Sequence, residues 1–287
     1  VDRYILDGKK IAVNLSAREL STEGLPGNTQ TWQNKHLIYT HGYGAVMSRV
    51  DRVTSEGLPE FLIQDIPPKA TVNIKIDRPE IYYGEHDAPY VITKTSIKPG
   101  EFDYPAGEEN MYTTYQGTGG IKLDSFFKKL MASVSFGDIN LLISGNIDRE
   151  SRLLIRRNIV DMARNFAPFL ELDDDPYLVI SEGKLYWIID AYTQSDMFPY
   201  STPISVGNKR LNYIRNSVKI IIDAYNGKIN CYITDQKDPI IKAYTGIFPG
   251  VFKDMKDIPE GLRSHIRYPE TIFNIQSHIL LKYHMTN

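Results

Sequence analysis

The segment VKIIIDAYNGKINCYIT, residues 218–234, carries the strongest fold signal in this sequence. Two apolar runs flank Asn226-Gly227, a dipeptide that readily adopts the positive φ angles of a two-residue hairpin turn. Such a turn predicts three apolar cross-strand pairs, namely Ile220–Ile233, Ile222–Cys231 and Ala224–Ile229. Because the turn chemistry and the apolar spacing agree, we expect an antiparallel hairpin with Cys231 on its buried face.

A similar pattern lies upstream, where YLVIS (177–181) and KLYWIID (184–190) flank Glu182-Gly183. The predicted cross-strand pairs are Ile180–Leu185 and Leu178–Trp187. Both faces of these two segments are apolar, which is typical of central strands that are covered on two sides. A further two-residue turn is predicted at Asp7-Gly8, near the start of the chain.

Helical patterns become frequent after residue 123. A helix that Asp124 or Ser125 can cap is expected to carry an apolar face, made of Phe126, Phe127, Leu130, Met131 and Val134. A longer helix is predicted over 149–166, because four apolar residues share one side of it: Ile155, Ile159, Met162 and Phe166. Helices are also expected within 260–283, where Pro269 occupies a first helical position.

These elements together predict an α+β fold, because the strands arrive as adjacent hairpins and do not alternate with helices. The expected organisation is a strand- and loop-rich part over 1–122 and a helix-plus-sheet part over 123–287. An alternative is that the two parts form one continuous domain.

Composition excludes several classes of protein. The 287 residues include 33 Lys and Arg against 35 Asp and Glu, and a net charge of −2 argues against a nucleic-acid binder. One cysteine excludes an intrachain disulfide, and the six histidines lack metal-ligand spacing, so we expect neither metal nor cofactor. The chain has no apolar window long enough to span a bilayer.

Acidic residues and a glycine-flanked histidine are the first candidates for a site. Glu101 and Asp103 are expected on one strand face, as a carboxylate pair that could serve a hydrolase; any acidic loop gives such pairs. In Thr40-His41-Gly42-Tyr43-Gly44, the glycines let the backbone approach a ligand or another strand closely. We therefore treat His41 and Tyr43 as candidate ligand-binding residues, with a packed turn as the alternative.

Three arginines give a second candidate site. Arg149, Arg152 and Arg156 fall within about 60° of one another on the helix predicted over 149–166. Guanidinium groups bind phosphate and carboxylate, so this stripe could receive an anionic ligand. The alternative is a structural network of salt bridges with carboxylates from other segments.

Stretches distributed along the whole chain resemble one protein family. They include EGLPEFLIQDIPP (56–68), FGDINLLIS (136–144), LYWIIDAYTQSDMFPYS (185–201) and NYIRNSVKIIIDAYNG (212–227). Through these stretches the chain resembles uncharacterised protein family 0182, a group of bacterial integral membrane proteins of unknown function. The resemblance implies that several transmembrane helices come first and that a large extracytoplasmic portion follows. We expect this chain to be a piece of that portion, and its first and last residues look truncated.

The function of such a chain is unknown, and the family has no catalytic residues to transfer. The resemblance predicts a location at the cell membrane, with this portion outside the cytoplasm and the parent's helices in the bilayer. There we expect a binding or scaffold module, with an anionic envelope ligand or a protein as partner and no role for nucleic acid. The alternative is a cell-envelope hydrolase that uses the acidic loop carboxylates.

Overall fold

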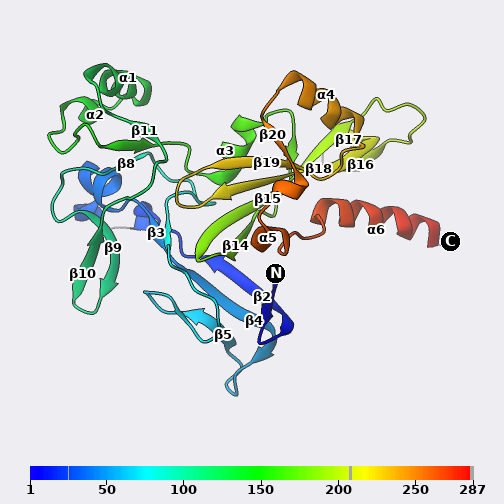
Figure 1. Cartoon of the computed structure of the whole chain (residues 1–287), viewed down its shortest axis with the longest axis horizontal. Helices are drawn as coiled ribbons and strands as arrows, with labels where there is room; N and C mark the ends of the chain where they lie inside the picture. Colours follow the sequence, from blue (N-terminus) through cyan, green and yellow to red (C-terminus); the bar gives the residue numbers. More distant parts are fainter. Residues whose placement is uncertain (25, 207–208, 285–287) are drawn as a thin grey trace.

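A mixed sheet lies at the centre of the computed structural model, which describes residues 1–24, 26–206 and 209–284 (Figure 1). Its strand order is β13 (Glu171–Leu172), β15 (Lys184–Ser195), β18 (Tyr213–Asp223), β19 (Ile229–Ile233) and β20 (Phe252–Asp254), and β14 (Tyr177–Ser181) also pairs with β15. All these pairs are antiparallel except β19 and β20, which are parallel. With the helices described below, these strands confirm the α+β fold.

Both faces of the central sheet are covered, as the apolar pattern predicted. One face contributes Ile180, Trp187 and Ile220 to the main hydrophobic core. The opposite face packs Val179, Ile188 and Ile221 against Ile258 and Leu262. Each large apolar side chain buried in this way contributes about 1.5–3 kcal/mol to stability, so the two-sided burial makes this sheet the centre of the fold.

Of the two predicted hairpin registers, one is confirmed and the other is wrong. The β14–β15 pairs Ile180–Leu185 and Leu178–Trp187 are confirmed. The β18–β19 prediction is wrong by two residues, because the observed pairs are Val218–Ile233, Ile220–Cys231 and Ile222–Ile229. A shift of two keeps each side chain on the same face, so Cys231 remains fully buried and burial raises the pKa of its thiol to about 12.

The side chain of Asp223 explains the shift. Asp223 Oδ1 accepts hydrogen bonds from the backbone N–H groups of Tyr225 and Asn226, at 2.8 and 3.1 Å. The N–H of Gly227 donates to the carbonyl of Asp223 at 2.8 Å, which widens the turn beyond the two residues predicted. Ala224 is thereby freed to bond with other segments of the chain.

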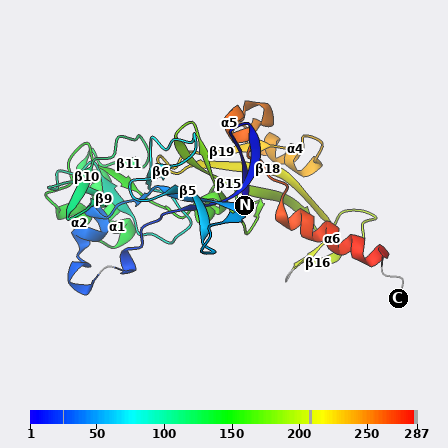
Figure 2. The same ribbon diagram turned by 90° about the horizontal axis from the view of Figure 1, so that it is seen from below.

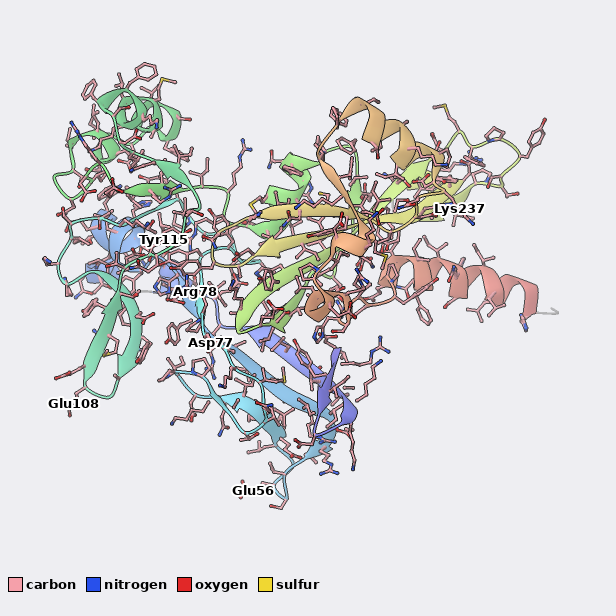
Figure 3. All side chains as sticks on the ribbon, viewed as in Figure 1. Glu56, Asp77, Arg78, Glu108, Tyr115 and Lys237 are labelled. Atoms are coloured by element: carbon pink, nitrogen blue, oxygen red, sulfur yellow. The ribbon has the colours of Figure 1, made fainter. Side chains whose placement is uncertain are left out.

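A second sheet lies below the central one in Figure 1. Its strands, in order, are β1 (Asp2–Leu6), β2 (Lys9–Ala17), β4 (Ala45–Val53), β5 (Pro59–Gln64) and β6 (Lys69–Ala70). Asp7 and Gly8 have φ angles of 49° and 74°, and Leu6 pairs with Lys9, which confirms the predicted turn. Glu56 marks the tip of the β4–β5 hairpin, far from the central sheet (Figure 3).

A third region combines segments from before and after residue 122. Its elements are β3 (Gly42–Tyr43), β7 (Glu80–Ile81), β8 (Val91–Thr93), β9 (Glu101–Ala106), β10 (Glu109–Thr113), β11 (Ile121–Lys122), β12 (Arg152–Leu154), α1 (Phe126–Phe136) and α2 (Asn140–Ile143). β12 lies between β8 and β11, so its sheet uses both predicted parts of the chain. The division at residue 122 stays a prediction. Figure 2 shows this region at one end of the molecule and α6 at the other.

The prediction of a helix over 149–166 is mostly wrong. α3 covers only Ile159–Phe166, and the side chain of Asn158 caps it by accepting from the N–H groups of Val160 and Asp161. Upstream of this cap, Leu153 and Leu154 are adjacent and both buried, which suits a strand covered on both faces better than a helix. Pairing with β8 and β11 therefore overrides the helical periodicity of the local sequence.

The helix predicted after residue 123 forms, but its apolar face does not pack. Ser125 caps α1 by accepting from the N–H of Lys128, as the sequence allowed. Phe126 and Phe127 are nevertheless 70% and 67% exposed, and Met131 and Val134 are also exposed. Most of this apolar face is exposed because α1 lies at the outer end of its region (Figure 1).

The remaining elements surround the central sheet or connect the regions. They are α4 (Pro239–Ile247), α5 (Glu260–Arg263), α6 (Glu270–His284), β16 (Ile204–Val206), β17 (Lys209–Leu211) and the short turns of helix η1 (Thr22–Gly24), η2 (Gly27–Thr29), η3 (Asn34–Ile38) and η4 (Met255–Asp257). Within the described ranges, none of the helices has the length and apolar character needed to cross a membrane.

Candidate functional site

Four of the predicted candidate residues belong to one part of the third region. His41 directly precedes β3, Tyr43 lies on β3, and Glu101 and Asp103 lie on β9. β3 pairs with β7, so that Tyr43 lies opposite Glu80. The structure therefore places acidic side chains from β7 and β9 beside the segment that contains His41 and Tyr43.

The glycines beside His41 serve chain packing. A Cβ atom on Gly42 would lie 2.3 Å from the carbonyl oxygen of Arg18, and one on Gly44 would lie 2.4 Å from Pro68 Cγ. Gly44 also has a φ angle of 77°, in the left-handed region. The close approach that the sequence suggested is thus made by other segments of the chain.

Glu101 is a buried carboxylate held by four hydrogen-bond donors. Thr40 Oγ1 and Tyr82 OH donate to its Oε2 at 2.8 and 2.9 Å. The backbone N–H groups of Lys94 and Tyr115 donate to its Oε1 at 3.2 and 3.1 Å. Glu101 is only 2% exposed, and this burial raises the pKa of its carboxyl. Such a carboxylate organises the fold and has no open side for a substrate, which weighs against its use as one member of a hydrolase pair.

Arg157 is the buried cation of this cluster, and the sequence patterns gave no reason to select it. Its guanidinium donates to the carbonyl oxygens of Tyr82, Pro89 and Thr40, at 2.7, 3.1 and 2.6 Å. Burial lowers the pKa of Arg157 to about 10. Since Thr40 and Tyr82 each bond to Glu101 through a hydroxyl and to Arg157 through a carbonyl, they link the two charges.

His41 is a fully enclosed histidine of the same cluster. Burial and, to a smaller extent, the charge of Arg157 lower its pKa to about 4, while the hydrogen bond to Gly42 opposes this shift. Its Nδ1 lies 3.0 Å from the carbonyl oxygen of Gly42, and its ring centroid lies 4.8 Å from that of Tyr82. Its Nε2 is buried and has no hydrogen-bond partner among the residues described.

The tyrosines of this cluster connect it to the central sheet. Tyr82 contacts the rings of Tyr115 and Tyr225, at centroid distances of 4.7 and 5.3 Å. The backbone N–H of Tyr82 donates to the carbonyl of Ala224 in the β18–β19 turn, at 2.9 Å. Arg78 lies over the Tyr225 ring, 4.3 Å from its centroid, where the third region meets the central sheet (Figure 3).

The accessible edge of the cluster is formed by Tyr43, Glu80 and Asp103. Burial, with the nearby charges of Glu80 and Glu101, raises the pKa of Asp103 to about 6. Burial also raises the pKa of Glu80. Asp103 Oδ1 and Glu80 Oε2 are buried atoms that lack a hydrogen-bond partner within the described part of the chain. Tyr43 packs on Tyr104 with their ring centroids 4.8 Å apart.

Glu80 was missed by sequence reasoning, although a signal existed. It belongs to the stretch PEIYYGE (79–85), which contains two adjacent tyrosines between two acidic residues. Its proximity to Asp103 depends on β3, because β3 pairs with β7 and also packs beside β9. A spacing of more than twenty positions between Glu80 and Asp103 gives no local indication of this contact.

The arginine stripe does not exist as predicted. Arg149 lies in the bend before β12, Arg152 lies on β12, and Arg156 has a φ angle of 51° outside any helix. The guanidinium of Arg152 donates to the carbonyl oxygens of Thr118, Gly119 and Gly120, so it fastens that loop. A helical face that would gather the three cations is absent, and with it the basis for an anion site there.

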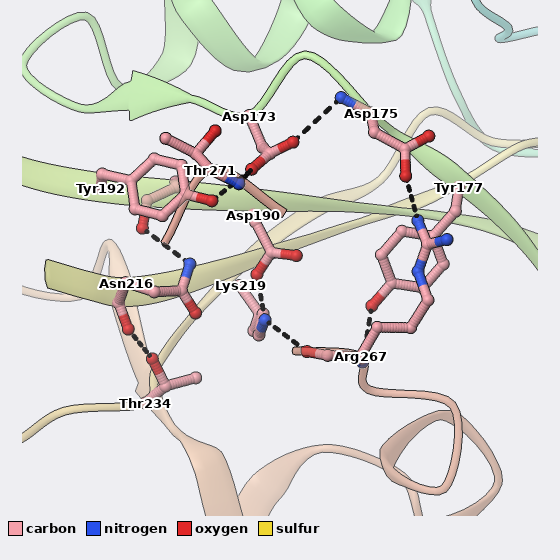
Figure 4. A network of polar contacts seen from close by, with 11 residues as sticks. Asp173, Asp175, Tyr177, Asp190, Tyr192, Asn216, Lys219, Thr234, Arg267 and Thr271 are labelled. Atoms are coloured by element: carbon pink, nitrogen blue, oxygen red, sulfur yellow. Dashed lines mark hydrogen bonds and ion pairs between the residues drawn. The ribbon is translucent and has the colours of Figure 1, made fainter. Parts of the chain in front are cut away.

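A second buried polar cluster lies on the opposite side of the central sheet (Figure 4). Lys219 Nζ bonds to Asp190 Oδ1 and also donates to the carbonyl oxygen of Arg267 at 3.3 Å. Asp173 accepts from the hydroxyl of Tyr192 and from the N–H of Thr271, the latter at 3.2 Å. The charged groups drawn in this network have partners, and the contacts join the segment before α6 to the sheet.

Arg267 completes the contact between this segment and the sheet. It pairs with Asp175 at 2.9 Å and lies 3.6 Å from the centroid of the Tyr177 ring. As for metals, the described ranges contain no group of three or more His, Cys, Asp and Glu side chains that could hold an ion.

Comparison with known proteins places the chain in a family. It is 52% identical, over its full length, to UPF0182 proteins of Methanospirillum hungatei and Clostridium acetobutylicum, and 50% identical over 99% of its length to one of Pelotomaculum thermopropionicum. The chain spans 31–32% of the length of these curated relatives. No solved structure matches it. The profile of the uncharacterised protein family UPF0182 matches residues 1–287, and the chain therefore belongs to that family.

Proposed function

We propose that this chain is the extracytoplasmic portion of a protein of the cell membrane and that it acts there as a ligand-binding module. The location rests on the family resemblance. The relatives have about two thirds of their length outside the matched part, which gives room for membrane-spanning helices. The binding role rests on the edge formed by Tyr43, Glu80 and Asp103.

The observation that carries the binding role is the pair of unpartnered acidic oxygens. A buried polar atom without a hydrogen bond costs about 1–3 kcal/mol, so such atoms are rare in folded proteins and call for an explanation, here a ligand. Asp103 Oδ1 and Glu80 Oε2 are two such atoms from neighbouring strands. Burial raises the pKa of both carboxyls, and at Glu80 the charge of Arg78 offsets this only in part.

The ligand that best fits this edge is an organic cation. An ammonium group donates charge-assisted hydrogen bonds to carboxylates, and it is also attracted to the faces of aromatic rings. Tyr43 and Tyr104 supply two such rings beside Asp103. Glu101 adds negative charge near Asp103, but its carboxylate is buried and does not contact the ligand directly.

Binding can be tested by calorimetric titration of the chain with spermidine at pH 5 and pH 8. We expect binding that strengthens roughly tenfold between these values, because Asp103 loses its proton near pH 6. Asp103→Asn should weaken binding at pH 8 and remove the part of the pH dependence that Asp103 contributes. Glu108→Gln, at the exposed tip of the β9–β10 hairpin (Figure 3), is the matched control and should bind like the wild type. Absence of spermidine binding to the wild type, or equal binding by Asp103→Asn, would overturn the proposal.

The location can be tested separately in a full-length relative. Protease added to intact cells that produce the Clostridium acetobutylicum protein should cleave its segment that matches this chain. The same protease should leave a cytoplasmic control protein intact. Protection of the segment in intact cells, with cleavage after lysis, would contradict the proposed topology.

A further inference from the structure

A cavity of about 620 Å³ lies where the second sheet meets the central sheet. It is lined by the β1–β2 hairpin, the segment 73–77, the turn between β14 and β15, and the end of α5 with the residues after it. Its volume falls within the range of about 300–1,000 Å³ that is usual for small-molecule sites. Four separate segments of the chain thus meet around a space that no described side chain fills.

One wall of this cavity contains a histidine oriented by a carboxylate. His265 Nδ1 lies 2.8 Å from Asp2 Oδ2, and the two side chains are 9% and 6% exposed. The ring of Tyr4 packs on the ring of His265 with centroids 4.3 Å apart. Because the carboxylate takes the hydrogen on Nδ1, the ring is fixed and its Nε2 is left to bond with another group.

Three cations line the same cavity. Arg3, Lys10 and Lys75 are exposed, and within the described part of the chain none of the three forms an ion pair. Asp77 and Glu182 are the acidic residues of the lining, so the cations remain in excess. The carboxylate of Asp77 lies against the backbone of the β14–β15 turn, where a Cβ on Gly183 would be 2.2 Å from its Oδ2.

The lining also has an apolar part. Ile5, Ile74 and Ile180 contribute to it, and Ile180 is buried while Ile5 is largely exposed. An occupant of this space would therefore meet positive charge at the exposed side and apolar surface farther in. These two properties together select against a free inorganic ion and against a purely apolar compound.

We propose that this cavity binds a small anionic ligand with a short apolar portion, whose head is a phosphate or a carboxylate. The head lies among Arg3, Lys10 and Lys75, and the ring of His265, fixed by Asp2, forms part of the wall against which the ligand packs. The apolar portion packs on the isoleucines. This site shares no residue with the edge formed by Tyr43, Glu80 and Asp103, and it takes a ligand of the opposite charge.

Calorimetric titration of the chain with hexyl phosphate and with hexanoate tests this proposal and identifies the head group. Inorganic phosphate is the control for the head group alone, and 1-hexanol is the control for the alkyl portion alone. We expect at least one of the two complete amphiphiles to bind at least tenfold more tightly than either control. Binding of hexyl phosphate alone indicates a phosphate ligand, and binding of hexanoate alone indicates a carboxylate ligand.

Charge reversal locates the site. Lys75→Glu and Lys10→Glu should each weaken binding of the amphiphile roughly tenfold, and both positions are exposed, so the variants should fold. Lys237→Glu, an exposed position beside α4 (Figure 3), and Asp103→Asn should leave the affinity unchanged. The proposal is overturned if neither amphiphile binds at millimolar concentration, if 1-hexanol binds equally well, or if Lys75→Glu and Lys10→Glu bind like the wild type.

Discussion

The two buried polar clusters of this protein differ in how completely their charges are paired. In the Asp190–Lys219 cluster, the lysine meets both a carboxylate and a backbone carbonyl, and the neighbouring Asp173 accepts from two donors. At the Glu80–Asp103 edge, each carboxyl keeps one buried oxygen without a partner in the described structure. A satisfied network stabilises a fold, whereas an unsatisfied one is suited to receive a ligand.

Glu101 and Arg157 form a third group of buried charges. Glu101 accepts four hydrogen bonds, and Arg157 donates three to backbone carbonyl groups. They therefore resemble the Asp190–Lys219 cluster in satisfaction, although they lie next to the unsatisfied edge. The comparison favours a structural role for them beside the edge that we propose binds a ligand.

The largest expected effect is the loss of the buried cation in the satisfied cluster. Lys219→Ala should lower the free energy of unfolding by about 3–5 kcal/mol, because it leaves the Asp190 carboxylate buried without its partner. Urea unfolding at pH 7 measures this loss. The double variant Lys219→Met/Asp190→Leu should recover most of the stability, because it removes both charges. A loss below about 1 kcal/mol for Lys219→Ala would show that water reaches this pair.

Removal of a charge at the Glu80–Asp103 edge is expected to have a smaller effect, and it should increase stability. The folded state raises the pKa of Asp103 to about 6 from an ordinary value of 3.8, so it holds this proton more tightly than the unfolded state. Ionisation of Asp103 thus costs stability as the pH rises from about 4 to 6. Asp103→Asn should raise the free energy of unfolding by about 1 kcal/mol above pH 6, a value reduced for partial solvent access, and should have no such effect below pH 4. A destabilised variant at pH 8 would contradict this account of the edge.

The smallest effect concerns the exposed face of α1. Phe127→Ser should change the free energy of unfolding by no more than about 0.5 kcal/mol, because the Phe127 side chain is largely in solvent. Trp187→Ala, in the central core, is the matched contrast and should cost about 3–5 kcal/mol. Thermal or urea unfolding of both variants checks the difference. A large loss for Phe127→Ser would mean that α1 packs against another part of the chain.

Much of the site was beyond the reach of sequence reasoning, because it depends on contacts between distant segments. Glu101 and Asp103 could be selected as a carboxylate pair, but their alternation along β9 does not reveal that one is enclosed and the other is accessible. Arg157 has no distinctive neighbours in the sequence, and only the carbonyl groups that converge on it explain its burial. The arginine stripe was wrong because strand pairing at β12 displaced the predicted helix.

The sequence by itself determined the features that local conformation controls. Asp7-Gly8 and Glu182-Gly183 adopt positive φ angles and set the registers of their hairpins, and Ser125 caps its helix, because these preferences act within a few residues. Tertiary structure decided the β18–β19 register, where the Asp223 side chain widens the turn and Ala224 bonds to Tyr82. It also decided which apolar faces are covered and which acidic groups meet, because burial and charge proximity depend on segments that are far apart in the chain.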